Sequence, residues 1–297
     1  MIESVWRLVK GVRNYRNPFW LMFQRALKSP IVTVVDRKTG LRFRCRRGAE
    51  VMMAETLHAH IYDIAFAPVR KGDVVFDVGA SHGYFACWAA YQGATVHAFE
   101  PDPDVFKLLV ENIRANGLDD RVTAYPIAVG GESGPANLLC TPRLGGGMNT
   151  TIPAFAQNTR IDITAQARVE MLSLPDAMAK CQVERLRVCK LDCEGAELSI
   201  LGSLDPATIE KVDAFVFEYH PEAYDVLLLV ESLLGWKDYH ISKVTSADVQ
   251  NANLCAVRSE LIREWCVGQN SSFREQCKLT PRTAPPIESR QALNKRS

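Results

Sequence analysis

The 297-residue sequence lacks several features that mark whole classes of protein. Its formal net charge is only +1, so its overall field favours neither nucleic acid nor an acidic partner. It contains no internal repeat with a period of about 20 to 50 residues, which argues against solenoids and propellers. Its first apolar run, residues 19–23, is far too short for a secretory signal or a membrane span. We therefore expect a globular protein without a secretory leader.

Paired cysteine spacing is also missing. The nine cysteines form no CxxC motif, their number is odd, and most lie within apolar runs. A structural zinc site or a disulfide framework would need paired residues. We therefore expect reduced, buried thiols in a reducing compartment, and we predict a cytoplasmic protein without a bound metal.

The first 30 residues are rich in basic and aromatic side chains. Glu3 is the only acid before residue 30. Six cations surround five aromatic residues in this segment, namely Arg7, Lys10, Arg13, Arg16, Arg25 and Lys28 around Trp6, Tyr15, Phe19, Trp20 and Phe23. Such a segment can rest on an anionic membrane or a protein partner. The commoner outcome is an amphipathic helix packed on its own domain, and both interpretations stay open.

From residue 74 onward, short apolar strands alternate with helical segments. We expect strands at residues 74–78, 94–99, 121–129, 186–192 and 212–219, with helices at 84–91, 104–115, 174–179, 196–203 and 222–234. This alternation predicts βαβ units and an α/β fold with a doubly wound, mostly parallel sheet. A short strand of hairpin type is expected at 136–140, a long loop at 141–168, and a terminal antiparallel pair at 236–243 and 252–258.

The chain divides into three predicted parts. Residues 1–49 form an N-terminal extension of basic helices and a β-hairpin, with strands at 31–35 and 41–45. Residues 50–262 form the α/β domain, which begins with a helix at 50–66. Residues 263–297 have no hydrophobic periodicity, so we expect a C-terminal tail that is partly disordered.

A glycine-containing turn follows the first parallel strand. The run Asp77-Val-Gly79-Ala80-Ser81-His82-Gly83 ends that strand and opens a helix. Gly79 lets the backbone turn sharply, and the helix directs its free amide groups into the same space. Glu100 ends the second strand, where a carboxylate can accept hydrogen bonds from a ribose diol. The carboxyl edge of the sheet is therefore a candidate site for an adenosine-containing ligand.

The glycine spacing argues against a dinucleotide. A GxGxxG fingerprint would need glycines where Ser81 and Tyr84 stand, so a pyrophosphate would lose its close backbone approach. Asp77 suits a cationic amino-acid ligand better than a phosphate. These features favour S-adenosylmethionine. The alternatives are a dinucleotide, or an ordinary tight turn beside an unrelated glutamate.

Several segments resemble the FkbM family of S-adenosylmethionine-dependent methyltransferases. They are VVFDVGASHGYFACWAA (74–90), VHAFEPDPDVFKLLVENIRANGL (96–118), AVGG (128–131), LRVCKLDCEGAELSIL (186–201) and VFEYHPE (216–222). The resemblance covers roughly residues 50–258 in one order, and the K-x-D-x-E-G-A-E string is its most distinctive part. The sequence departs from the family at Ser81 and His82, where Asn and Ile are usual. This departure puts a side-chain contact from position 81 in doubt.

The resemblance implies a class I methyltransferase fold of Rossmann-like type and an enzyme that methylates hydroxyl groups of sugars, polyketides, lipids or other small metabolites. It also implies that the glycine turn lines the methionine part of the cofactor, that Glu100 holds the ribose, and that Ile127 and Ala128 face the adenine. The predicted cofactor-binding residues are Asp77, Gly79, Ala80, Ser81, Gly83, Glu100, Pro101, Ile127 and Ala128. We expect a small-molecule acceptor with a hydroxyl group, and no nucleic acid, as partner.

Acidic residues and a histidine lie at the next two strand ends. Methyl transfer to an alcohol needs an acceptor held in line and a base for its proton. We predict Asp192, Glu194 and His220 as catalytic candidates, because a histidine ordinarily titrates near neutral pH. Lys190 is expected to pair with these acids. The alternatives are helix capping by Asp192 or Glu194, and a divalent metal held by Asp192, Glu218 and His220.

Two other function classes stay open on the sequence alone. A nicotinamide-dependent oxidoreductase would use a similar fold, although the missing glycines disfavour it. A binding protein would keep the methyltransferase fold without the activity, because a fold does not fix a function. The sequence identifies neither the acceptor nor the oligomeric state.

Overall fold

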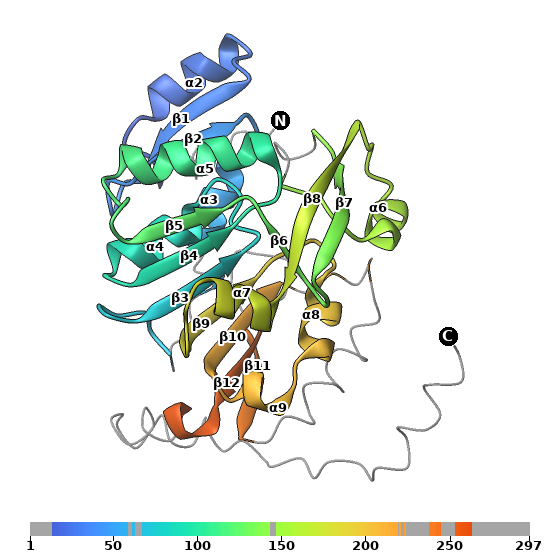
Figure 1. The fold of residues 1–297 in the computed structure, drawn as a ribbon. Coiled ribbons are helices and arrows are strands. Elements are labelled where there is room, and N and C mark those ends of the chain that lie inside the picture. The colour runs from blue at the N-terminus through green and yellow to red at the C-terminus, as the bar shows by residue number, and fades with distance from the viewer. Residues whose placement is uncertain are drawn as a thin grey trace.

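The computed structural model describes residues 14–58, 61–62, 67–142, 147–218, 220, 223, 238–244 and 253–262. Its central sheet is formed by β3 (Val74–Val78), β4 (Thr95–Phe99), β5 (Val122–Tyr125), β9 (Leu186–Leu191), β10 (Val212–Glu218), β11 (Tyr239–Val244) and β12 (Asn253–Arg258). The strand order is β11-β12-β10-β9-β3-β4-β5 (Figure 1). Five strands run parallel, and β11 and β12 add an antiparallel pair at one edge. The predicted doubly wound sheet with a terminal antiparallel pair is confirmed.

Helices cover both faces of this sheet, because alternate strand residues point to opposite sides. On one face, Val75 packs in a buried core with residues of α4 (Tyr84–Tyr91) and α5 (Pro103–Ala115). On the other face, Phe76 packs in a core with residues of α7 (Leu174–Lys180) and α8 (Glu197–Ser203). A short helix, α9 (Pro206–Ile209), follows α8. Strands buried on both faces explain the continuous apolar runs in the sequence.

A second sheet contains β6 (Ala128–Gly130), β8 (Ala165–Ser173) and β7 (Gly134–Cys140), in that order. The single strand expected at 121–129 is therefore wrong, because β5 stays in the central sheet and β6 joins the second one. Pro126 lies at the break, where it has no amide hydrogen to give to a strand ladder. β7 is a strand as predicted, and it pairs antiparallel with β8.

The long loop expected at 141–168 is wrong in part. It contains α6 (Pro153–Thr159) and the beginning of β8. Its glycine, asparagine and proline content resembles that of a loop, but Pro153 stands at a helix start, where a proline is well tolerated. The helix expected at 50–66 is shorter, since α3 covers Glu50–Leu57. The helix expected at 222–234 and the C-terminal tail lie outside the described residues.

The N-terminal extension contains α2 (Pro18–Ala26) and the antiparallel strands β1 (Ile31–Val35) and β2 (Arg42–Arg46), so the predicted hairpin is confirmed. Two asparagine side chains hold the hairpin: Asn112 in α5, and Asn116 directly after that helix. Each side-chain amide donates one hydrogen bond to a backbone carbonyl of β2 and accepts one from the backbone amide of the same residue, at 2.7–2.9 Å. Asn112 pairs in this way with Arg44, and Asn116 with Arg42. Four residues of helix rise about 6 Å and two residues of strand about 6.8 Å, so the two spacings match. The hairpin is thereby fixed to α5.

Two further expectations concern the whole chain. None of the helices among the described residues combines the length and the apolar character that a membrane crossing requires. The cysteines that the structure describes are all free, and they are Cys45, Cys87, Cys140, Cys181, Cys189, Cys193 and Cys255. Four of these, Cys45, Cys87, Cys189 and Cys255, are buried as predicted, and the other three are only partly buried.

Candidate functional site

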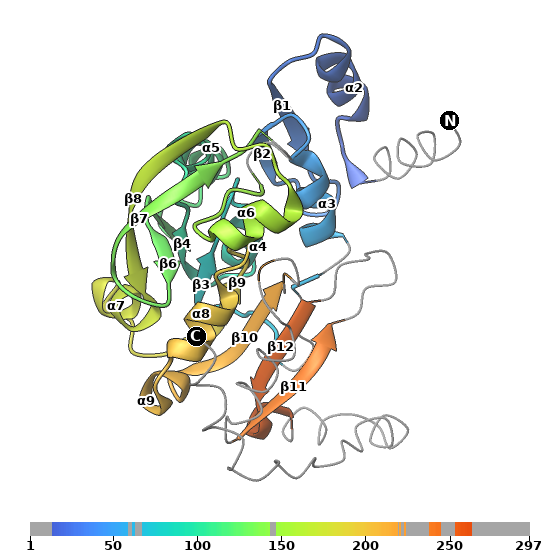
Figure 2. The same ribbon diagram turned by 90° about the vertical axis from the view of Figure 1, so that its right-hand side faces the viewer.

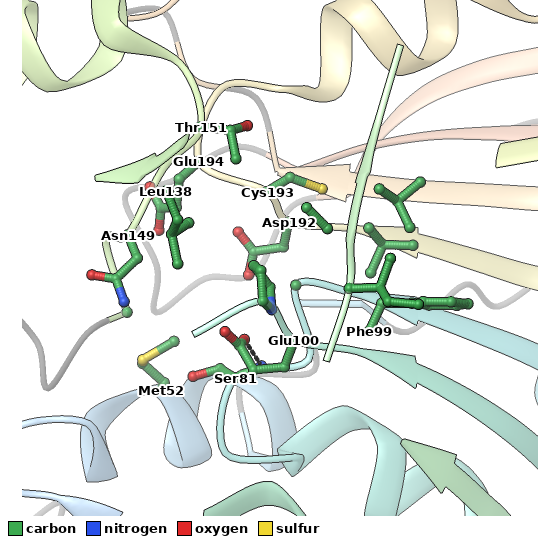
Figure 3. Close-up of a pocket in the computed structure, with 17 residues that line it drawn as sticks. Met52, Ser81, Phe99, Glu100, Leu138, Asn149, Thr151, Asp192, Cys193 and Glu194 are labelled. Atoms are coloured by element: carbon green, nitrogen blue, oxygen red, sulfur yellow. Dashed lines mark hydrogen bonds between the residues drawn. The ribbon is translucent and has the colours of Figure 1, made fainter. Parts of the chain in front are cut away.

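A pocket opens where the strand order of the central sheet reverses. β3 has β4 on one side and β9 on the other, and ligands of doubly wound sheets bind outside the carboxyl ends of strands at such a point. The space between its lining atoms is about 590 Å³, part of which is open to solvent. Its walls come from the ends of β3, β4 and β9, from β6 and β7, and from Met52 of α3 (Figure 3).

The glycine turn sits unusually close to the end of β9. Gly79 has a φ of +73°, and a Cβ atom there would lie 1.8 Å from the carbonyl oxygen of Asp192. The backbone amides of Gly79 and Ala80 both donate to the carbonyl of Phe99, at 3.1 and 2.9 Å. Lys190 donates from Nζ to the Gly79 carbonyl at 2.8 Å. These contacts hold the turn between the ends of β4 and β9, so only glycine fits the position.

Glu100 is 7% exposed and lines the pocket. Its Oε2 accepts the Ser81 amide and its Oε1 accepts the Asp102 amide, both at 2.8 Å. Burial raises the pKa of the Glu100 carboxyl to about 7. Each carboxylate oxygen accepts more than one hydrogen bond, so this carboxylate remains able to bind two hydroxyl groups of a ligand.

The two positions at which the sequence departs from the family, Ser81 and His82, make structural contacts. Ser81 contributes its backbone amide to Glu100, and its Oγ lies 3.0 Å from His82 Nδ1. The backbone amide of Arg46 in β2 donates to His82 Nε2 at 3.3 Å. Burial lowers the pKa of His82 to about 3, so the ring is neutral with its proton on Nδ1. His82 therefore joins the glycine turn to the N-terminal hairpin.

Asp77 does not line the pocket, contrary to its predicted place beside the cofactor. Its buried carboxylate lies beneath the turn, with Oδ1 3.1 Å from Lys190 Nζ. The same Nζ lies 3.6 Å from Asp192 Oδ2. Burial alone would lower the pKa of Lys190, but the two aspartates raise it above its usual value. Lys190 thus remains a cation and is an ion-pair partner, as predicted.

Asp192 lines the pocket and also binds a tyrosine that the sequence did not identify. Tyr62 donates from its hydroxyl to Asp192 Oδ2 at 2.7 Å, and its ring lies 5.1 Å from Lys190 Nζ. Burial and the Asp192 charge raise the pKa of Tyr62, so this hydroxyl keeps its proton. The two residues are 130 positions apart in the chain, so no local pattern could have joined them.

His220 lies behind the pocket and not on its wall. Its Nε2 is 3.3 Å from Glu194 Oε2, and its Nδ1 is 3.3 Å from Glu197 Oε2. Burial alone would lower the pKa of His220, but the charges of Glu197 and Glu194 raise it to about 12. The expectation that His220 acts as a base near pH 7 does not fit this geometry, because the imidazole is already protonated.

Glu194 and Glu197 have different surroundings on the turn after β9. Glu194 lines the pocket, and burial raises the pKa of its carboxyl to about 7. Glu197 accepts backbone hydrogen bonds from Cys193 at 2.7 Å and Gly195 at 3.1 Å. Glu197 thus satisfies free amides near the start of α8, the role that the sequence had suggested for Asp192 or Glu194.

One group of side chains has the spacing of a metal site. Asp192, Glu197 and His220 each place one donor atom within 4.8 Å of the others. This set differs from the alternative considered in the sequence, in which Glu218 took the place of Glu197. Glu197 already accepts two backbone amides, and His220 lies 3.3 Å from both Glu194 and Glu197. The group is better described as an ion-pair network.

The structure thus brings together most of the predicted residues. Those that line the pocket are Gly79, Ser81, Glu100, Pro101, Ile127, Ala128, Asp192 and Glu194. Figure 3 shows Glu100 and Ser81 at one end, Glu194 and Thr151 at the other, and Asp192 between them. Asp77, Ala80, Gly83 and His220 are outside its lining. Met52 and Leu138, which the sequence did not single out, also contribute.

Comparison with known proteins gives the same chemistry. The chain matches the methyltransferase FkbM domain over residues 77–239, more than half of its length. It is 27% identical to the hexuronic acid methyltransferase AglP of Haloferax volcanii, over 72% of this chain and 83% of that protein. It is 30% identical to the 31-O-demethyl-FK506 methyltransferase FkbM of Streptomyces tacrolimicus, over 51% of this chain and 67% of that protein.

Among solved structures, the chain is similar to a methyltransferase FkbM from Methylobacillus flagellatus KT. The TM-score is 0.46 and the sequence identity 16%, over 69% of this chain and 47% of that one. The extent of the domain match sets aside the oxidoreductase and non-catalytic alternatives. The chain belongs to the FkbM methyltransferase family and is a methyltransferase with a class I, Rossmann-like fold.

Proposed function

We propose that this enzyme transfers a methyl group from S-adenosylmethionine to a hydroxyl group of a sugar, lipid, polyketide or other small metabolite. One observation carries the proposal: a single pocket has the glycine turn and Glu100 at one end and the Asp192 and Glu194 carboxylates toward the other. The names of the two relatives, a hexuronic acid methyltransferase and a 31-O-demethyl-FK506 methyltransferase, support a small-molecule acceptor.

The cofactor end of the pocket fits S-adenosylmethionine. Glu100 can bind a ribose diol, while Ile127 and Ala128 provide an apolar wall for an adenine ring. The amides and carbonyl of the glycine turn are fixed by Phe99 and Lys190, so the methionine part would meet a rigid backbone surface. Asp77, Ala80 and Gly83 would act by shaping this turn. When bound, the cofactor supplies a methyl group on a sulfonium centre.

We assign Asp192 as the group that takes the proton of the acceptor hydroxyl. Tyr62 and Lys190 hold its carboxylate in place at 2.7 and 3.6 Å, and both keep their protons. Glu194 would orient the rest of the acceptor through hydrogen bonds. His220 is then a positioning residue, because it contacts Glu194 and Glu197 and lies outside the pocket lining.

The proposal extends to the organisation of the chain. Residues 50–262 would form the catalytic domain, and residues 14–49 would be packed against it through α5 and His82. The free cysteines of the described residues support action in a reducing compartment such as the cytoplasm.

The experiment has two stages. Calorimetry compares S-adenosylhomocysteine with NAD, and we expect binding of the former alone. Radiolabelled S-adenosylmethionine is then offered with hexuronic acids, neutral hexoses and polyketide alcohols, and the product is examined by NMR for a new methoxy group. Tight NAD binding would overturn the cofactor assignment, whereas label found only on nitrogen or carbon would overturn the hydroxyl acceptor. Glu132→Gln, an exposed change on the surface, serves as the control for Glu100→Gln.

A further inference from the structure

Helix α2 turns polar side chains toward the protein and apolar side chains toward solvent, the reverse of an ordinary surface helix. Its polar residues face the protein: Asn17 and Gln24 pair through their amides with the backbone of Thr33 and Val35 in β1, at 2.9–3.3 Å. Leu21, between them on the same side of the helix, is buried. Since residues three and four apart share a face, the remaining side of the helix is fixed toward solvent.

That outer side is apolar. Its exposed residues are Phe19, Trp20, Met22, Phe23 and, at the helix end, Leu27. Phe19 is 81% exposed, Leu27 65%, and Trp20 stacks on Phe23 with ring centroids 5.4 Å apart. Isolated exposed apolar residues are common, but a contiguous group on one helix marks an interaction surface. The expectation that this segment buries its apolar side on its own domain is therefore wrong for α2.

The apolar side of α2 sits within a strongly basic segment. Residues 14–49 contain nine lysines and arginines, and eight of them are exposed. Their only acid is Asp36, which is buried and paired with His58. The segment has a formal charge of 9 − 1 = +8, which leaves 1 − 8 = −7 for the rest of the chain. Arg25 pairs with Glu50, and Arg44 pairs with Glu111.

We propose that α2 and the surrounding basic hairpin form a docking surface for an anionic lipid bilayer. Tryptophan, phenylalanine and leucine on one side of a helix enter the headgroup region of a bilayer, and nearby lysines and arginines bind anionic lipids. The segment has both features, and its charge is complementary to that surface. A nucleic acid would be served by the cations alone, and it would leave Met22 and Leu27 in water.

The position of α2 in the molecule suits this role. In both views α2 stands at the top of the molecule, on the side of the hairpin that faces away from the central sheet (Figures 1 and 2). α3 follows the hairpin in the chain and places Met52 on the pocket wall. A bilayer on α2 would therefore leave the central sheet uncovered and keep the pocket connected to the docked segment through α3.

The test is co-sedimentation of the full chain with vesicles. Phosphatidylcholine vesicles are compared with mixed phosphatidylcholine–phosphatidylglycerol vesicles at low and high salt. We expect binding to the mixed vesicles only, weakened by salt because the attraction is screened. Trp20→Ser combined with Phe23→Ser should lower the binding about tenfold or more. Tyr91→Ser on α4, which is 53% exposed like Trp20, should bind like the wild type.

A second pair of variants tests the charge. Lys28→Glu combined with Lys38→Glu should lower binding to the mixed vesicles about tenfold or more, whereas Lys71→Glu combined with Lys211→Glu, also exposed, should not. Circular dichroism confirms that each variant is folded. No wild-type binding to either vesicle, or equal loss in the control variants, overturns the proposal. A dimer seen by light scattering that the combined Trp20→Ser and Phe23→Ser change dissociates would also overturn it. Binding of a single-stranded oligonucleotide without binding of vesicles would overturn it as well.

Discussion

Gly79 shows how one missing side chain sets the geometry of the pocket. A Cβ atom at this position would overlap the Asp192 carbonyl oxygen, a backbone atom that cannot turn aside as the end of a flexible side chain can. Gly79→Ala should therefore lower the free energy of unfolding by about 3 kcal/mol or more, measured in denaturant. Gly202→Ala is the matched control, because no atom lies within 4 Å of its Cβ position in α8. It should leave stability unchanged or raise it by up to about 1 kcal/mol.

Glu100 should make cofactor affinity depend on pH. Its pKa is raised to about 7 by burial, so a large part of the carboxyl is protonated at neutral pH. The ionised form is the better acceptor for ribose hydroxyls, so affinity for S-adenosylhomocysteine should rise as pH increases from 6 to 8. Calorimetry at several pH values measures this. Glu100→Gln should bind about tenfold or more weakly and lose the pH dependence, and a slope retained in this variant would assign it to another group.

Asp192 and Tyr62 should affect turnover more than cofactor affinity. Asp192→Asn removes the charge without changing size, so turnover should fall about 10²–10⁴-fold if this carboxylate accepts the proton. Tyr62→Phe removes the hydroxyl that holds Asp192 and should cause a smaller fall of the same kind. Steady-state kinetics with calorimetry of S-adenosylhomocysteine separates the two effects. A loss of cofactor binding in both variants would instead make this pair part of the cofactor support.

The attachment of the hairpin to α5 depends on asparagine side chains. Asn112 is buried and makes hydrogen bonds with the amide and carbonyl of Arg44 and with the carbonyl of His82, at 2.7–2.9 Å. Asn112→Ala would leave these backbone groups unpaired and should lower the free energy of unfolding by about 2–4 kcal/mol. Asn116→Ala, at the exposed end of the same helix, should cost about 1 kcal/mol. Equal costs for the two changes would contradict this account.

The central strands could be predicted from the sequence because each is a short apolar run buried on both faces. Val74–Val78 and Leu186–Leu191 are examples, and both lie close to their predicted bounds. β8 could not be predicted in the same way. Its side chains alternate between partly buried and exposed, and its first residues follow a segment rich in turn-forming residues. β6 was missed because its change of sheet depends on tertiary pairing with Met171–Ser173.

The candidate site was predictable only as far as backbone position determines it. Glu100 and Asp192 end strands of the parallel sheet, and their place on the pocket follows from that. The role of His220 could not be predicted, because its protonation depends on Glu194 and Glu197, which reach it from a different strand end. The outward orientation of α2 likewise depends on contacts of Asn17 and Gln24 with β1, which no helical pattern reveals.

The titration of buried groups should make the whole molecule more stable in mild acid than in mild alkali. Burial raises the pKa of Glu194 to about 7 and that of Glu218 to about 8. The stability from such a group is complete below its unfolded pKa and is lost as pH rises through the folded value. The neighbouring glutamates raise the pKa of His220 to about 12, so its contribution is also complete below its unfolded pKa and declines above it. Between pH 6.5 and 9, the titrations of Glu194, Glu218 and His220 therefore all lower the stability of the folded protein as pH rises.

Asp36 and His82 make the folded protein more stable as pH rises, but they do so only below about pH 6.5. The hydrogen bonds of Asp36 with His58 and Thr39 outweigh its burial and lower its pKa to about 2, so its contribution is lost only in strong acid. His82, held neutral by burial with a pKa of about 3, opposes folding only below its unfolded pKa. We therefore expect the melting temperature to fall by at least about 3 °C between pH 6 and pH 9, since one pKa unit corresponds to about 1.4 kcal/mol.

Substitution of Glu218 identifies the source of this slope. Glu218→Gln keeps the size of the side chain and is neutral at every pH, so it should resemble the protonated glutamate and reduce the fall in melting temperature. The exposed Glu132→Gln should keep the wild-type slope. Differential scanning calorimetry without ligand measures all three proteins, because a bound cofactor would favour ionised Glu100 and oppose the trend. A wild-type melting temperature that stays constant or rises from pH 6 to 9 would show that the buried glutamates are ionised in the folded protein. It would also contradict the raised pKa of His220.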